Sequence, residues 1–408
     1  MKLPRGLVSL PLVALFALPA SAQEPSPADA YFLGYESEPG MDYGGRTLAS
    51  VQSGISRGFQ SIFEKTTVAP AWEFASAAAL LLVQHEVGWH GGRGREFGLG
   101  PSYSFGWDLS GATSLARSPR THEENALLAA GGAEADAVMA RRILLEALSP
   151  EGVDGAKIPL AMMAKLDLTM YVLGTVDPDD PDFTDEYREG NDTAYWNVTR
   201  QARRRGASVA SVFEGTYEPD RGDPLFEETW DDAQATALWN ALDPSLVTAV
   251  YAYFRDHVLG GGGPVRQRLL HAGDWGFTVG TRGALGPQEV TRFLDLHAVA
   301  PWGALTVYVR DLDSSVDRTL GYGAGVRGLR LGHAAELAVE GDVWTLPDPA
   351  EEIQPEGEDG WNVSAEVDAM LGERWGLAAK VGSKSAGFFP GKPLDEGVYA
   401  GFGVRAVF

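Results

Sequence analysis

The feature that most constrains the fold is a strict alternation of apolar and polar residues from about Asp274 to the C-terminal Phe408. Successive side chains of a β-strand point to opposite faces, so this pattern predicts strands with one apolar face. Eight such segments follow one another, and the last is Val398–Phe408. Their length of roughly ten residues suits strands that cross a membrane in a small barrel. We therefore expect an eight-stranded antiparallel transmembrane β-barrel over residues 267–408.

The connections between these segments alternate in length. Tight turns are expected near Trp302, Arg330 and Glu373, whereas Thr345–Asp359 and Ser383–Glu396 are long links. Short turns on one side and long loops on the other are typical of bacterial outer-membrane barrels. An even number of strands would place both ends of the barrel on the side of the short turns. The preceding domain would then lie in the periplasm.

The chain ends in alternating apolar residues and a terminal aromatic residue: Phe402, Val404, Ala406 and Phe408. This ending resembles the signature of outer-membrane β-barrel proteins and covers about the last 135 residues. The resemblance implies contact with outer-membrane lipid and a lumen filled by charged side chains. A soluble β-sandwich or lipocalin-like barrel, with its apolar face turned inward, would also produce the alternation.

The N-terminus has the pattern of an export signal. Residues 1–22 combine Lys2 and Arg5, the apolar run Leu7–Leu18 and a small-residue cleavage site at Ala20–Ala22. Residues 23–44 are rich in Pro, Ser and Gly, which predicts a flexible lead-in. The 408 residues include no Cys, so disulfides and thiolate metal sites are excluded, and a net charge of −23 argues against nucleic acid as a partner.

Residues 45–259 show helical spacing, and a Gly-rich linker at 260–266 separates them from the strands. The fold class is therefore α+β and multidomain. Charged residues interrupt the apolar helices, Glu73 in one and Lys165 and Asp167 in another, so none is predicted to span a membrane alone. They are expected to be buried in a packed domain or to lie against the membrane.

One segment, Gln84–His90, contains a candidate metal-binding motif. His85, Glu86 and His90 form the pattern H-E-x-x-x-H, which offers two imidazole ligands and a general base to zinc. Five residues of an α-helix turn by about 500°, which leaves the imidazoles about 140° apart. A one-residue π-bulge would bring them to one face, and Gly88 makes this distortion easy. Without zinc, His90 would cap the helix and His85 would face solvent.

This spacing resembles the zinc motif of dipeptidyl peptidase III, which takes a Glu from a later helix as its third ligand. The resemblance covers six residues and carries over only His85, Glu86 and His90. Our candidate for the third ligand is Glu134, near the start of a later helix, and Asp136 is expected to orient a ligand histidine.

Together these features predict a zincin-like helical domain held on the periplasmic side of the bacterial outer membrane by a barrel. Glu86 would take a proton from a zinc-bound water, which would attack an envelope polypeptide. The alternative is a non-catalytic outer-membrane anchor or assembly protein whose helical domain docks partners.

Overall fold

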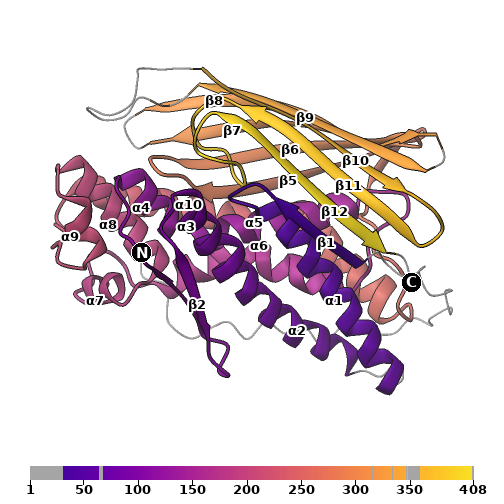
Figure 1. Ribbon diagram of the computed structural model, residues 1–408, viewed down its shortest axis with the longest axis horizontal. Helices are drawn as coiled ribbons and strands as arrows, with labels where there is room; N and C mark the ends of the chain where they lie inside the picture. Colours follow the sequence, from indigo (N-terminus) through magenta and orange to yellow (C-terminus); the bar gives the residue numbers. More distant parts are fainter. Residues whose placement is uncertain are drawn as a thin grey trace.

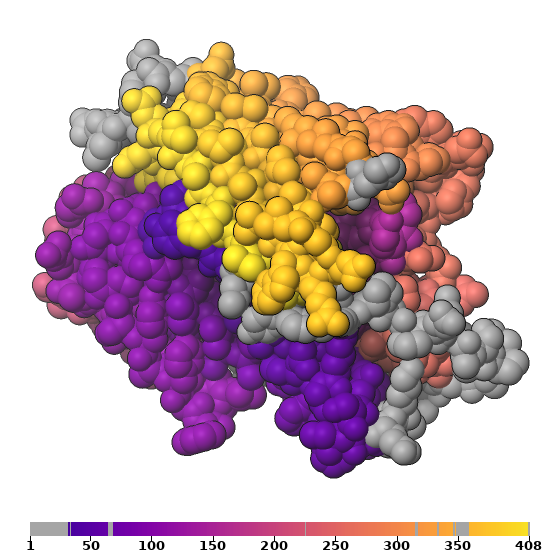
Figure 2. All heavy atoms as spheres, turned by 45° about the vertical axis from the view of Figure 1, so that its right-hand side comes forward, coloured from indigo at the N-terminus to yellow at the C-terminus, as the bar shows by residue number. Residues whose placement is uncertain are grey.

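A computed structural model describes residues 31–63, 68–314, 317–332, 334–345, 347 and 359–406. The predicted signal segment 1–22 and the terminal Phe408 lie outside these residues. The molecule consists of two layers, a helical layer from the first two thirds of the chain and a sheet from the last third (Figure 1). Figure 2 shows the same division, with the C-terminal sheet stacked on the N-terminal helices.

The helical layer contains α-helices and two π-helical segments, each of which continues an α-helix. The α-helices are α1 (Met41–Phe63), α2 (Ala69–Val83), α3 (Gly91–Glu96), α4 (His122–Ala129), α5 (Gly131–Glu146), α6 (Lys157–Gly174), α7 (Phe183–Arg188), α8 (Asp192–Arg204), α9 (Val209–Phe213), α10 (Pro224–Ala241) and α11 (Pro244–Ala252). The π-helices are η1 (Gln84–His90), which follows α2, and η2 (Tyr253–Val258), which follows α11. A hairpin of β2 (Pro101–Phe105) and β3 (Gly111–Leu115) projects from this layer (Figure 1).

The sheet has ten strands in the order β1-β12-β11-β10-β9-β8-β7-β6-β5-β4, and every neighbouring pair is antiparallel. The eight predicted segments correspond to β5 (Trp275–Leu285), β6 (Val290–Ala300), β7 (Gly303–Asp313), β8 (Arg318–Leu331), β9 (Ala335–Thr345), β10 (Asp359–Met370), β11 (Trp375–Lys384) and β12 (Gly397–Ala406). Each pairs with its sequence neighbour, as a meander of short and long connections requires.

The sheet differs from the expected eight-stranded barrel, because it is open and has two further strands. Strand β1 (Tyr31–Glu36) pairs along β12, with Tyr35 opposite Phe402, and β4 (Leu270–Ala272) pairs with the start of β5. Strand β1 comes from the segment expected to be a flexible lead-in. Its residues occupy the edge of β12 that would otherwise have paired with β5, so the sheet does not close on itself.

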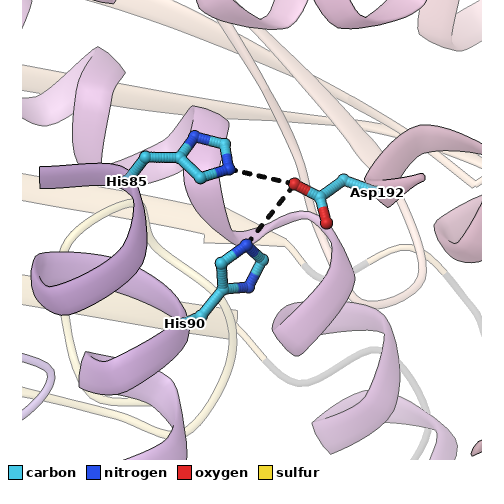
Figure 3. Close-up of side chains that lie close together, drawn as sticks. All are labelled: His85, His90 and Asp192. Atoms are coloured by element: carbon cyan, nitrogen blue, oxygen red, sulfur yellow. Dashed lines mark hydrogen bonds and ion pairs between the residues drawn. The ribbon is translucent and has the colours of Figure 1, made fainter. Parts of the chain in front are cut away.

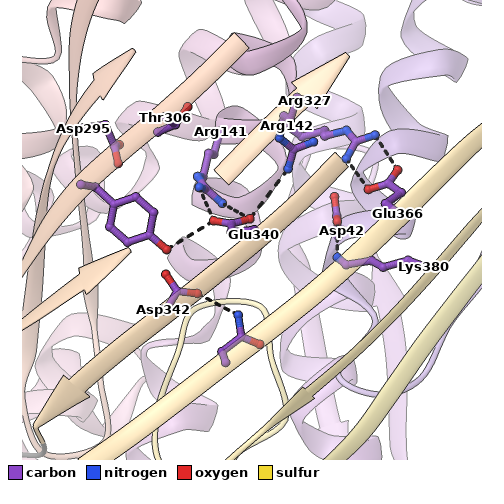
Figure 4. A network of polar contacts seen from close by, with 12 residues as sticks. Asp42, Arg141, Arg142, Asp295, Thr306, Arg327, Glu340, Asp342, Glu366 and Lys380 are labelled. Carbon is purple, nitrogen blue, oxygen red and sulfur yellow. Dashed lines mark hydrogen bonds and ion pairs between the residues drawn. The ribbon is translucent and has the colours of Figure 1, made fainter. Parts of the chain in front are cut away.

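The outward face of the sheet is apolar and the face toward the helices is polar. In β6, Leu294 and Leu296 are about half exposed, whereas Asp295 between them is buried. The inward charged side chains form ion pairs with each other and with α1 and α5 (Figure 4). The cavity between α5 and the sheet has a volume of about 70 Å³, room for a few water molecules, so side chains fill most of this space.

Two apolar clusters hold the helical layer together. One joins α4, α6, α8 and α10 around Trp196 and Phe226, and the other joins α5, α6 and α11 around Met139 and Tyr253. Among the described residues, no helix combines the length and the apolar character that a single membrane crossing requires.

Candidate metal centre

The motif of His85 and His90 lies on the π-helix η1. The amide of Gly91 donates to the carbonyl of Glu86, an i→i+5 bond that marks the wider π-helical turn. As a result, the two imidazoles lie on one side of the helix, with ring centroids 5.1 Å apart. The local distortion therefore overcomes the divergence that five residues of a regular α-helix would produce.

A carboxylate from another helix lies between the two rings. Asp192 is the first residue of α8, and the side chain of Asn191 caps this helix by accepting from the amides of Thr193 and Ala194. Oδ2 of Asp192 lies 3.1 Å from Nε2 of His85 and 3.4 Å from Nε2 of His90 (Figure 3). Two ligands at about 2.1 Å from a tetrahedral zinc ion would be separated by about 3.4 Å, so these spacings suit one ion.

The second nitrogen of each histidine faces an oxygen. Nδ1 of His90 donates to the carbonyl of Leu128 at 2.7 Å, and Nδ1 of His85 lies 3.4 Å from Asp167 and 3.5 Å from Asp136. A proton on each Nδ1 leaves each Nε2 free as a metal ligand. Oxygen acceptors behind ligand histidines are the usual arrangement in metalloproteins, because they fix the tautomer and the ring orientation.

The described residues contain two groups of metal-ligating type, and His85 belongs to both. They are His85, His90 and Asp192, and His85, Asp136 and Asp167. Asp136 is fully buried and neither of its carboxylate oxygens has a hydrogen-bond partner. Asp136 thus lies at Nδ1 of His85, the side on which it was expected to orient a ligand histidine, and Asp167 of α6 lies at the same nitrogen.

The charges in this cluster are strongly coupled. Burial lowers the pKa of His85, but the neighbouring carboxylates of Asp167, Asp136 and Asp192 outweigh burial and raise it well above the ordinary value. Burial and the charge of Asp167 raise the pKa of Asp136. Burial opposes ionisation of Asp192, yet the two histidines hold its pKa below the usual range. Without a cation, bound protons must balance the negative charge of these clustered carboxylates. A metal ion that binds here would displace protons from the histidines and carboxylates.

The hydroxyl of Tyr171, on α6, also lies at the centre. It is 3.2 Å from Nε2 of His85, and the tyrosine ring stacks on the imidazole at a centroid distance of 5.2 Å. This donor is therefore near the position that a ligand of the metal would occupy.

Glu86, the expected general base, is buried on η1. Its carboxylate accepts a hydrogen bond of 2.7 Å from the hydroxyl of Thr113, on β3. The hairpin packs closely here, since a Cβ on Gly111 would lie 2.7 Å from the Glu86 side chain. The structure thus gives Glu86 a fixed orientation, but Glu86 is in neither metal-ligating group.

Glu134, the expected third ligand, is held elsewhere. Its two oxygens accept from the guanidinium of Arg93 at 3.0 and 3.2 Å, and Oε1 also accepts from the amide of Gly391. Glu134 is in neither group, whereas Asp192 lies between the two histidines. Burial raises the pKa of Glu134 to about 7, although Arg93 and Gly391 oppose this rise.

Two glycines at the start of α5 allow the close approach of α5 to η1. A Cβ on Gly132 would lie 1.6 Å from Cε1 of His85, and a Cβ on Gly131 would lie 0.8 Å from Nε1 of Trp89. The segment Gly131–Asp136 therefore acts as one contact surface, in which the glycines touch η1 and Asp136 supports His85.

Sequence reasoning missed three residues of the centre: Asp167, Tyr171 and Asp192. Asp167 and Tyr171 are four residues apart on α6 and so share a face, a spacing that could have paired them. Asp192 follows an Asn in an acidic segment. This pattern indicates the start of a helix, but nothing in it indicates a metal ligand.

Comparison of the chain with protein-family models, with curated protein sequences and with solved structures finds no match.

Proposed function

We propose that this chain is a zinc-dependent hydrolase of the bacterial cell envelope, anchored in the outer membrane by its sheet. The observation that carries the proposal is the convergence of His85, His90 and Asp192 at spacings suited to one ion. Two histidines and one carboxylate, with a further position left for water or substrate, form a common ligand set of catalytic zinc sites.

The supporting residues favour catalysis over a purely structural ion. The side chains of His90 and Asp192 keep 15% and 19% of their surface exposed, so a substrate can approach on their side, whereas Asp136 is fully buried behind His85. When bound, zinc would supply a Lewis acid that polarises a carbonyl and acidifies a water molecule.

The chain's own groups would perform the proton transfer. Glu86 adjoins the ligand His85 in sequence and is the candidate base that accepts a proton from the attacking water, with Thr113 holding its carboxylate. The Tyr171 hydroxyl is placed to donate a hydrogen bond to the oxygen of a polarised carbonyl. The proposed substrate is an envelope polypeptide.

The membrane location is supported by the sheet. Its outward face carries exposed apolar residues on every strand from β5 to β12, while its inward face carries buried ions. This arrangement is the reverse of a soluble β-sandwich and agrees with a face in contact with lipid.

Metal analysis of the detergent-solubilised full chain tests the proposal. Mass spectrometry of the metal should find about one zinc per native chain and none in His85→Ala. The native chain should hydrolyse a fluorogenic peptide library. Glu86→Gln should retain zinc but lose this hydrolysis. Unchanged hydrolysis in Glu86→Gln would show that Glu86 is not the base. A chain without stoichiometric metal would favour the non-catalytic anchor instead.

A further inference from the structure

Helices α2, α6 and α11 of the helical layer expose no charged side chain. Helix α2 contains one charged residue and α6 contains three, while α11 contains none. These four residues are all more than nine-tenths buried: Glu73, Lys157, Lys165 and Asp167. Their partners also lie inside, since Glu73 pairs with His257 at 3.1 Å and Lys165 with Asp243 at 3.1 Å.

The outward faces of the same helices are apolar. On α6, Met170 and Leu173 expose 67% and 71% of their surface, and on α11 Val247 and Tyr251 expose more than half. Trp72 is exposed on α2, whose one charged residue, Glu73, is buried. Buried charges under an exposed apolar surface reverse the arrangement of a water-soluble helix, and the sheet has the same arrangement.

The exposed residues of helix α10 change from charged near its start to apolar near its end. Near its start, Glu227 and Glu228 are exposed, whereas near and just beyond its end Leu238 and Leu242 are exposed. About ten residues separate the two pairs, which corresponds to roughly 15 Å along a helix. On the side of the start of α10, exposed ion pairs of the ordinary surface type are present, such as Arg188 of α7 with Glu218, and Arg205, which follows α8, with Asp220.

The helices also complete the open edge of the sheet. On β5, the amides of Thr281 and Gly283 donate to the side chains of Asp243 and Asn240 at 3.2 and 2.7 Å. The carbonyl of Gly283 accepts from Asn240, and that of Thr281 accepts from Lys165. Inside a bilayer, an unpaired strand edge is prohibitive, because no water satisfies its backbone groups. The side chains of the helical layer satisfy this part of the β5 edge.

We propose that the outward face of α2, α6 and α11 contacts the acyl chains of the same bilayer as the sheet. The body in the membrane is then a composite, with a wall of strands on one side and a wall of helices on the other. This inference rests on the proposed outer-membrane location and extends it, because an anchor of the sheet alone would leave the helical layer in water. The occupant is lipid because the sheet and these helices both expose apolar side chains above buried charges, and one bilayer supplies an apolar medium to both.

Site-directed spin labelling tests the inference, and the absence of Cys from the chain means that each introduced cysteine is the sole attachment point. The labels are Leu173→Cys and Val247→Cys on the helical face, Leu296→Cys and Val381→Cys on the sheet, and Glu227→Cys as the aqueous control. All five side chains are exposed, so labelling removes little packing. The full chain is reconstituted in phospholipid vesicles, and collisions with oxygen, enriched in lipid, are compared with those of a water-soluble nickel chelate.

We expect several-fold more oxygen than nickel relaxation at both helical and both sheet positions, and the reverse at Glu227→Cys. Strong nickel relaxation at Leu173→Cys and Val247→Cys, with the sheet positions still protected, overturns this inference but keeps the sheet as anchor. Nickel access at the sheet positions as well overturns the membrane location itself. Protection of the helical positions from both reagents, with dipolar broadening between labels, would show a second copy of the chain instead of lipid and would also overturn the inference.

Discussion

His85 and His90 are separated by five residues of one helix, yet their Nε2 atoms approach the same carboxylate oxygen of Asp192. This is possible because the helix from Gln84 to His90 is π-helical. A regular helix would place the rings about 140° apart, so the two side chains converge only because the helix is distorted. Short π-helical segments are frequent at functional sites for this reason.

The first prediction separates Asp192 from Glu134 as the third ligand. Asp192→Asn removes the charge between the two histidines, so we expect loss of stoichiometric zinc. Glu134→Gln is the matched control, and it is expected to retain zinc because Glu134 pairs with Arg93. Metal content per chain, measured after dialysis against a weak chelator, decides between them. Zinc lost from Glu134→Gln but kept by Asp192→Asn would restore the original expectation.

The sequence predicted only those residues of this centre that lie close together along the chain. His85 and His90 lie on one π-helical segment, so their relation depends only on the local helix geometry. Asp192 is more than a hundred positions from His85, and its approach depends on how α8 packs in the helical layer. A single sequence carries no signal for that packing. The predicted ligand Glu134 instead pairs with Arg93, a contact that also depends on how the helices pack.

The second prediction concerns the close contact of α5 with η1. Gly132→Ala would place a Cβ 1.6 Å from Cε1 of His85, so the ring or the helix must shift. We expect reduced zinc affinity and a lower melting temperature. Gly54→Ala, in the exposed part of α1 where no atom lies within 4 Å, is the matched control. It should be neutral or stabilise by about 0.5–1 kcal/mol, as expected for helix propensity. Equal behaviour of the two variants would contradict the contact.

The strands were predictable for the same local reason as the motif, since alternation determines which face of each strand is apolar. Closure was not predictable from alternation. Whether β12 pairs with β5 or with β1 depends on a six-residue strand that the sequence presents as a lead-in, and on helices that satisfy the edge at Thr281 and Gly283.

The third prediction concerns the ion pairs between the layers. Glu366, on β10, accepts from Arg142 of α5 at 2.8 Å (Figure 4). It also pairs with Arg46 of α1. Glu366→Ala would leave buried guanidinium groups without their shared partner, at a cost of about 3–5 kcal/mol. The control is Glu218→Ala, which removes an exposed pair with Arg188 and should cost at most about 1 kcal/mol. Denaturation of both variants in detergent gives the comparison, and similar losses would rule out a special role for the buried network.

The last prediction is a pH dependence of stability that arises from Glu134. Burial raises the pKa of this carboxyl to about 7 in the folded chain, above its ordinary value of 4.5, even though Arg93 lies 3.0 Å away. A raised pKa means that the folded state holds the proton more tightly than the unfolded state. The contribution to stability is therefore complete below about pH 4.5 and is lost as the pH rises through about 7, by up to about 3 kcal/mol. Glu134→Gln keeps the shape of the protonated carboxyl and cannot ionise, so its melting temperature should fall less than that of the native chain between pH 5 and about 8. Parallel pH profiles for the two chains would show that Arg93 fully compensates the burial of this carboxylate.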